Sequence, residues 1–166
     1  MILNMNQSNR IEEVKASVKQ ASEGLLKTFS FVPDDKLTWS PSDSSRSALW
    51  IVGHCAEANR AFARGIRGES FPSMSMEEFG QMVWNAGRDT KSRAEAVTLL
   101  QESTQEIVAA LDGLTSEKMS AVVQSPFGPI PVAVWMTFAD GHMMGHACQI
   151  EYLQTIWGDQ QSHMMG

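Results

Sequence analysis

Apolar residues that recur three and four positions apart are the feature that most limits what this 166-residue chain can fold into. In the first stretch with this spacing they are Ile11, Val14, Val18, Ala21, Leu25 and Phe29. Because an α-helix turns once in about 3.6 residues, these side chains share one face, as they do in a helix that packs in a bundle. Ser8 is a suitable N-cap, and Glu12 and Glu13 suit the positive start of a helix. The sequence therefore predicts a first helix that follows Ser8 and ends near Phe29.

The same spacing predicts three further long helices, over approximately residues 44–67, 92–111 and 131–157. Gly68, Gly113 and Gly158 follow them, and glycine commonly ends a helix. The inward face expected for the last helix consists of Trp135, Phe138, His142, Gly145, Gln149, Leu153 and Ile156, with His146 beside it.

The connections between these helices differ in length and character. Residues 68–91 are irregular, with a short helix expected near 76–84. Residues 121–131 carry an FGPIP turn between apolar runs, which is typical of a short β-hairpin or of an extended turn in a long crossover. No repeat or flexible linker divides the chain. We therefore expect residues 1–166 to form one all-α domain, a four-helix bundle with a long crossover connection.

Composition and charge exclude several classes of function. The hydrophobic content of 43% and charged content of 19% are those of an ordinary globular domain. A net charge of −6, with no run of Lys or Arg, argues against a nucleic-acid partner. No segment approaches the roughly 20 apolar residues that span a bilayer, and MILNMNQSNR lacks the features of a signal peptide. Two cysteines do not make a disulfide framework, so we expect a cytoplasmic protein.

Two of the chain's four histidines occur in the segment GHMMGH. His142 and His146 are four positions apart, which places them on adjacent turns with Cβ atoms about 6 Å apart. Two imidazoles at this spacing can bind one metal ion, at about 2.0–2.1 Å from each nitrogen. His54 lies in the inward stripe of the second predicted helix and can face this pair in a bundle. Three histidines with an open fourth position are typical of a catalytic metal site.

An alternative is that the three histidines are core residues bonded to carbonyl or carboxylate groups. Each buried ring would then need its own partner, because an unsatisfied buried polar group costs roughly 1–3 kcal/mol. One shared ion would satisfy all three rings together, so the residues alone leave the metal site and the core alternative equally open. Imidazole ligands suit zinc, nickel, iron and copper. We expect a divalent ion, zinc or nickel, with iron as an alternative.

Four other residues are candidates for the surroundings of the site. Glu57 and Gln149 lie one turn beyond His54 and His146, where they can contact a ligand side chain or a substrate. A solvated surface position is an equal alternative for Glu57. Trp50 and Trp135 are expected near the site, where they can line a pocket. No catalytic residue beyond the metal ligands can be assigned.

The two cysteines, Cys55 and Cys148, each lie close in sequence to one of the histidines. Either thiol could act as a soft metal ligand. Cys55 directly follows His54, however, so the two side chains point about 100° apart on a helix. We therefore predict that both cysteines are small core residues.

Three segments resemble the DinB/YfiT-like proteins: LTWSPSDSSRSALWIVGHCAEANRAF, FGPIPV and FADGHMMGHACQIEYL. The resemblance covers most of the chain, in the same order. It implies a four-helix bundle with a long crossover, and a divalent metal held by His54, His142 and His146. It also implies a homodimer. Some members are transferases or isomerases that use bacillithiol, mycothiol or glutathione, and others are described as metal-dependent hydrolases.

The leading hypothesis is therefore a metal-dependent enzyme. The ion would lower the pKa of a bound thiol or water, which would then attack a small electrophilic substrate. By family resemblance alone, transfer of a low-molecular-weight thiol is preferred to hydrolysis. The alternative is a non-catalytic helical dimer stabilised by metal, or a small-ligand-binding protein. A purely structural site would need a fourth protein ligand, for which Cys148 and Glu57 are the candidates.

Overall fold

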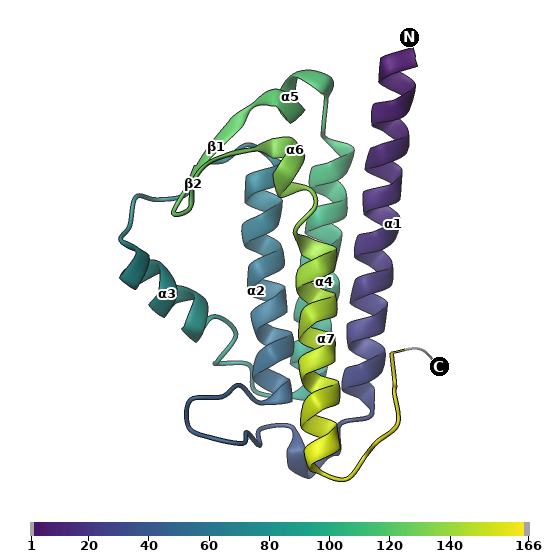
Figure 1. Ribbon diagram of the computed structural model, residues 1–166, viewed down its shortest axis with the longest axis vertical. Coiled ribbons are helices and arrows are strands. Elements are labelled where there is room, and N and C mark those ends of the chain that lie inside the picture. The colour runs from purple at the N-terminus through teal and green to yellow at the C-terminus, as the bar shows by residue number, and fades with distance from the viewer. Residues whose placement is uncertain (1, 165–166) are drawn as a thin grey trace.

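The computed structural model describes residues 2–164, with their side chains from Ser8 onward. Four long helices lie side by side (Figure 1): α1 (Ile2–Ser30), α2 (Ala48–Ile66), α4 (Arg93–Asp112) and α7 (Ala139–Ile156). The most extensive contacts are those of α2 with α4 and of α1 with α7. α2 also packs on α7, and α1 on α4. The predicted four-helix bundle is therefore confirmed.

The first helix is longer than its apolar stripe. Val18, Leu25 and Phe29 are buried as expected, but α1 already begins at Ile2. The prediction that Ser8 caps the helix is wrong, since Ser8 lies inside it and is exposed. No Gly or Pro interrupts the preceding residues, and extending a formed helix adds one hydrogen bond for each residue fixed. These first turns project beyond the other helices in Figure 1.

The connection from α1 to α2 is ordered and ends at a defined cap. It contains one turn of 3₁₀ helix, η1 (Asp34–Lys36). Ser47 then caps α2, because its side-chain oxygen accepts a hydrogen bond from the Trp50 amide at 3.3 Å. Such a cap satisfies one of the amides left without a partner at a helix start. The predicted start of the second helix, near residues 44–47, is confirmed.

The segment between α2 and α4 contains the predicted short helix, α3 (Met76–Asn85). Ser75 and Glu78 form a capping box at its start. The helix stands away from the bundle (Figure 1), and none of its residues is buried. Its last turn approaches α2 near the site described below.

The crossover from α4 to α7 passes over one end of the bundle (Figure 1). It consists of α5 (Ser116–Ser120), the antiparallel strands β1 (Val122–Ser125) and β2 (Gly128–Pro131), and α6 (Val132–Trp135). Gly128 has a φ of +96°, a conformation that glycine adopts without strain. Of the two alternatives for residues 121–131, the hairpin is therefore the one that forms.

The predicted helix over residues 131–157 is in fact two helices. It is interrupted at residues 136–138, where the amides of Thr137 and Phe138 bond to carbonyls three residues earlier. These tighter bonds end α6, and α7 begins at Ala139. The break changes the phase of the helix, so the predicted inward face is partly wrong. Gly145, Gln149 and Ile156 are exposed. The buried residues of α7 are Ala139, Met143, His146, Ala147, Ile150, Leu153 and Gln154.

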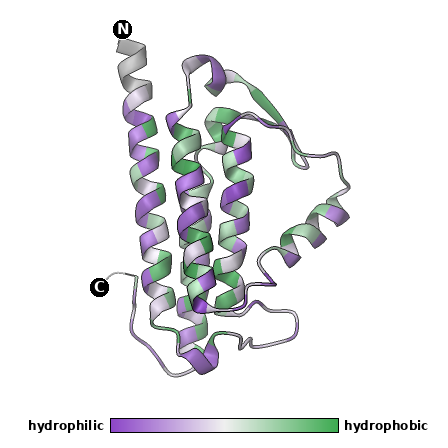
Figure 2. Ribbon diagram, turned by 180° about the vertical axis from the view of Figure 1, so that it is seen from behind, coloured by the Kyte–Doolittle hydropathy of each residue, from purple (hydrophilic) through white to green (hydrophobic). Residues whose placement is uncertain are grey.

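The core lies where the four long helices meet, and its buried apolar residues form one continuous cluster. Figure 2 shows hydrophilic and hydrophobic residues alternating around each long helix, as amphipathic packing requires. Within the described part of the chain, no helix combines the length and the apolar content that crossing a membrane requires.

Candidate metal centre

The structure brings together three histidines from two helices. His54 comes from α2, and His142 and His146 come from successive turns of α7. One ring nitrogen of each lies within 4.8 Å of the other two. The ring centroids are 5.2 Å apart for His54 and His142, 4.9 Å for His54 and His146, and 4.5 Å for His142 and His146. In the described residues, these three form the one group of His, Cys, Asp or Glu side chains with this geometry.

The three rings are largely buried, and two of them have a nitrogen without a hydrogen-bond partner. His54 and His146 are 4% and 9% exposed, and His142 is half-buried. The Nδ1 atoms of His54 and His142 are buried and have no hydrogen-bond partner among the described residues. Such orphaned atoms are destabilising, by about 1–3 kcal/mol each, unless something binds them. Borderline-soft imidazole nitrogens at this spacing fit a divalent transition metal.

Burial keeps these histidines neutral. It lowers the pKa of His54 to about 3 and that of His142 to about 4, and it also lowers the pKa of His146. The positive charge of Arg46 acts in the same direction on all three rings. A metal binds the neutral imidazole, so at pH 7 no proton has to be removed before an ion can bind.

The Gln149 side chain contacts one of the three histidines. Its Oε1 atom is 2.8 Å from Nδ1 of His146. Because an amide oxygen can only accept a hydrogen bond, this contact requires the proton on Nδ1. The Nε2 atom of His146 is then left with a lone pair. Contacts of this kind fix the ring and the tautomer of histidines that bind metals.

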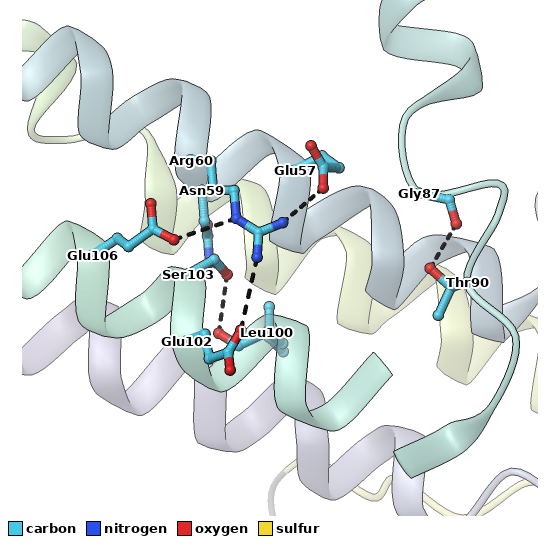
Figure 3. Close-up of polar contacts among 9 residues, drawn as sticks. All are labelled: Glu57, Asn59, Arg60, Gly87, Thr90, Leu100, Glu102, Ser103 and Glu106. Carbon is cyan, nitrogen blue, oxygen red and sulfur yellow. Dashed lines mark hydrogen bonds and ion pairs between the residues drawn. The ribbon is translucent and has the colours of Figure 1, made fainter. Parts of the chain in front are cut away.

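Glu57 does not lie against the histidines. Its carboxylate forms an ion pair with Arg60 at 2.7 Å, and Arg60 also reaches Glu106 at 3.3 Å. Figure 3 shows Arg60 between Glu57, Glu102 and Glu106, on the side where α2 faces α4. Glu57 is exposed and paired with Arg60, which is the surface position that the sequence left open as the alternative.

The ring contacts of the two candidate tryptophans are with other aromatic residues. The Trp50 indole donates a hydrogen bond to the Ala86 carbonyl at 3.0 Å and packs edge-on against Trp84. Trp135 is buried and reaches the site only through Phe62, whose ring centroid is 6.4 Å from that of Trp135 and 5.4 Å from that of His142. Phe62, and not Trp135, is therefore the aromatic wall next to His142.

Neither cysteine joins the histidine group. Cys55 is fully buried, as predicted, and burial raises the pKa of its thiol well above the usual range. It is therefore an inert core residue. The prediction of a core position for Cys148 is wrong, because Cys148 is exposed and its sulfur lies 3.9 Å from that of Met164. Cys148 is not among the residues that share the buried face of α7, so its side chain points outward.

A close approach of two backbones holds the segment after α3 against the site. A side chain on Gly53 would lie only 2.7 Å from the Gly87 carbonyl oxygen, so only glycine fits there. Gly87 has a φ of +76°, and its carbonyl accepts a hydrogen bond from the Thr90 hydroxyl at 2.8 Å (Figure 3). This packing brings the end of α3 to the residue that precedes His54.

Arg46 also lies near the site, although no sequence pattern indicates it. Its Nη2 atom donates to the Val83 carbonyl at 2.9 Å, and its guanidinium lies 4.8 Å from the ring of Trp84. The Val83 carbonyl also lies near the ring of His54, whose pKa it raises against the larger effect of burial. Arg46 belongs to a Ser-rich connection without periodicity, so no pattern in the sequence pointed to it.

Comparisons with known proteins agree with this architecture. A model of the DinB superfamily matches residues 17–150, which include all three histidines. The comparison with curated proteins found no match. Among solved structures, a DinB-like protein from Bacillus subtilis, YjoA, is similar with a TM-score of 0.64 and 17% identity, over 90% of this chain and 94% of that one.

Two further structures share the fold. YfiT from Bacillus subtilis, described as a probable metal-dependent hydrolase with an unusual four-helix bundle topology, has a TM-score of 0.65 and 15% identity over 89% of both chains. The mycothiol-dependent maleylpyruvate isomerase has a TM-score of 0.67 and 15% identity, over 84% of this chain but 60% of the isomerase. The match to the family model covers more than half of the sequence. This chain belongs to the DinB superfamily.

Proposed function

We propose that this protein is a metal-dependent enzyme that holds one divalent ion on His54, His142 and His146. The observation that carries the proposal is the convergence of three neutral imidazoles, two of them with orphaned buried nitrogens. The description of YfiT as a probable metal-dependent hydrolase supports it by analogy. Zinc or nickel is the expected metal, with iron as an alternative.

The chemistry of such a site follows from its open coordination. A bound divalent ion lowers the pKa of a water or thiol that occupies the free position. The residues of this chain orient the ligands and exclude water. Gln149 fixes the ring of His146, and Phe62 covers one side of His142. Burial of His54 in α2 keeps the third ligand in place.

Thiol transfer is the reaction that we place first. Cys55 is buried, and Cys148 is outside the histidine group, so neither offers a protein thiol to the site. The nucleophile would therefore be a small-molecule thiol or water. One structural relative is named for its dependence on mycothiol, and another is named as a probable hydrolase. Both names support this chain's activity by analogy only, so enzyme assays decide between thiol transfer and hydrolysis.

The alternative is a metal ion that only stabilises the fold. A structural zinc site normally has four protein ligands. The two candidates for a fourth ligand are elsewhere: Glu57 is paired with Arg60, and Cys148 contacts Met164. This arrangement favours an open site. If Cys148→Ser or Glu57→Gln released the metal, the structural alternative would replace the enzyme.

The homodimer and the cytoplasmic location stay predictions. Size-exclusion chromatography with light scattering would test the homodimer.

The function is tested by turnover of model substrates. Zinc-loaded and nickel-loaded protein would be assayed with bacillithiol, mycothiol and glutathione against 1-chloro-2,4-dinitrobenzene, in which the thiolate displaces chloride. Hydrolysis of 4-nitrophenyl acetate would be followed in parallel. We expect metal-dependent thioether formation with at least one thiol, lost in His142→Ala. Metal-dependent ester hydrolysis alone would favour the hydrolase. No activity from a metal-loaded protein would favour the non-catalytic alternative.

A further inference from the structure

A small pocket lies beside the histidine group, between the Ser-rich connection, the end of α3 and the second half of α7. Its volume is about 280 Å³, which is room for part of a small molecule. The residues that line it are Pro41, Ser44, Ser45, Arg46, Ile51, Trp84, Gln149, Tyr152 and Leu153.

Two of the lining residues connect this pocket to the histidines. Gln149 bonds to His146 at 2.8 Å. Arg46 donates to the Val83 carbonyl, which also lies near the ring of His54. A molecule that fills the pocket would therefore lie between Arg46 and Gln149, one side chain away from His146.

The pocket carries one positive charge and no carboxylate. None of its lining residues is Asp or Glu. Within the described residues Arg46 forms no ion pair, whereas the half-buried Arg60 contacts three carboxylates. The chain has a net charge of −6, so acidic side chains outnumber basic ones. The lack of an acidic partner for Arg46 is therefore not due to a shortage of carboxylates.

The guanidinium of Arg46 is held in a fixed position. It lies 4.8 Å from the ring of Trp84 and 5.6 Å from that of Trp50, both within the range of cation–π contacts. Its Nη2 atom is used by Val83, and its Nε atom is buried without a hydrogen-bond partner in the described structure. Ser44 and Ser45 line the same pocket, and their hydroxyls lie 3.2 and 2.7 Å from that of Ser42. A hydroxyl that accepts from Ser42 keeps its own proton for an anion. A planar guanidinium at the wall of the pocket, without an acidic partner among the described residues, suits a carboxylate.

We propose that this pocket binds a carboxylate of the small molecule that reacts at the histidine site, with Arg46 as the anchoring residue. The inference rests on the proposed function and narrows it to substrates or thiol nucleophiles that carry a carboxylate. Arg46 binds the charged end, while the thiol or electrophilic end reaches the open position at His54, His142 and His146. The role of Arg46 is to bind and orient the molecule, and no proton transfer is assigned to it.

The test compares two thiols that differ in one charge. N-acetylcysteine carries a carboxylate, and N-acetylcysteinamide is its neutral counterpart. Binding of each to zinc-loaded protein would be measured by isothermal titration calorimetry. We expect the acid to bind at least about tenfold more tightly, because hydrogen bonds to charged groups are among the stronger ones in proteins. Arg46→Gln should remove this preference, and Arg46→Lys should keep part of it because the charge remains.

Arg88→Gln is the matched control. Like Arg46, Arg88 contacts Trp50, with its guanidinium 5.4 Å from the ring. Arg88 is exposed, however, and does not line the pocket. Its loss should leave the preference unchanged. Circular dichroism and the zinc content of each variant show that it is folded and loaded.

Three results would overturn the proposal, and they are distinguishable. Equal affinity for the two thiols would reject the carboxylate pocket while leaving the proposed function intact. A preference that persists in Arg46→Gln would place the carboxylate elsewhere, for instance on the metal. Failure of the parent protein to retain zinc would reject the proposed function, and the inference would fall with it.

Discussion

The Nδ1 atom of His146 lies 2.8 Å from Oε1 of Gln149, one turn further along α7. This contact joins an exposed side chain to a buried ring. The orientation of His146 therefore depends on Gln149, whose side chain makes no other hydrogen bond among the described residues. A surface side chain, Gln149, therefore helps to orient one ligand of the proposed metal site.

Removal of this support should weaken metal binding. We expect Gln149→Ala to lower zinc affinity by about 10- to 100-fold, the usual effect of removing a residue that orients a metal ligand. Gln149→Glu should keep or raise the affinity, since a carboxylate also accepts the bond from Nδ1. A competition titration with a chromogenic chelator would measure both. Gln105→Ala, an exposed glutamine of α4, is the control. An affinity unchanged in Gln149→Ala would show that the contact has no role in binding.

Acid should destabilise the metal-free protein through the same histidines. The pKa of His54 is lowered to about 3 and that of His142 to about 4, from 6.5 when exposed. Between these values the unfolded chain binds more protons than the folded one, so stability is present above pH 6.5 and is lost as the pH falls toward 4. Each histidine contributes up to about 1.4 kcal/mol per pH unit in that window.

Urea unfolding between pH 7.5 and 4.5, with a chelator present, would measure this dependence. The double variant His54→Gln, His142→Gln should show a flatter dependence than the parent, because amides do not titrate in this range. Identical slopes for the two proteins would mean that other groups control acid stability. His163 is not changed in this variant, so its own interactions with Asp159 and Phe31 are common to both proteins.

The close approach of Gly53 and Gly87 should be sensitive to a single methyl group. A Cβ atom on Gly87 would overlap the backbone of Gly53 and His54, and the φ of +76° is unfavourable for alanine. We expect Gly87→Ala to lower the free energy of unfolding by about 1–3 kcal/mol and to weaken metal binding, because His54 moves with the backbone. Gly80→Ala on α3 is the control, since its Cβ would meet nothing within 4 Å.

Chemical denaturation and chelator competition on these two glycine variants would separate the effects. Gly80→Ala should be neutral or slightly stabilising, because alanine is favoured over glycine in a helix. If Gly87→Ala were as stable as the parent and bound zinc equally well, the packing of the segment after α3 would not control the position of His54.

The sequence predicted the long helices because their apolar stripes persist over several turns. Val18, Leu25 and Phe29 are buried where a 3.6-residue period places them. The same period could not reveal the interruption at residues 136–138, which depends on tertiary packing and carries no Gly or Pro signal. That interruption is why Gln149 is exposed, although a continuous helix would have placed it on the buried face.

The three histidines could be identified because the residue type and the spacing both carry chemical meaning. His142 and His146 share a helix face, and His54 interrupts an apolar stripe, where a polar ring needs a partner. Arg46 and Phe62 could not be placed in the same way. Their distances from the site depend on how the Ser-rich connection and α2 pack in three dimensions. Residues in irregular connections have no period from which a position can be derived.

The most direct measurement is the metal content of the purified protein and three single-histidine variants. His54→Ala and His146→Ala remove ligands from different helices, and His163→Ala removes a buried histidine that bonds to Asp159 outside the group. Mass spectrometry of the elements should find about one divalent ion per chain in the parent and in His163→Ala, and almost none in the other two. Loss of the metal in all three variants, or an equal content in all four proteins, would contradict a shared site on α2 and α7.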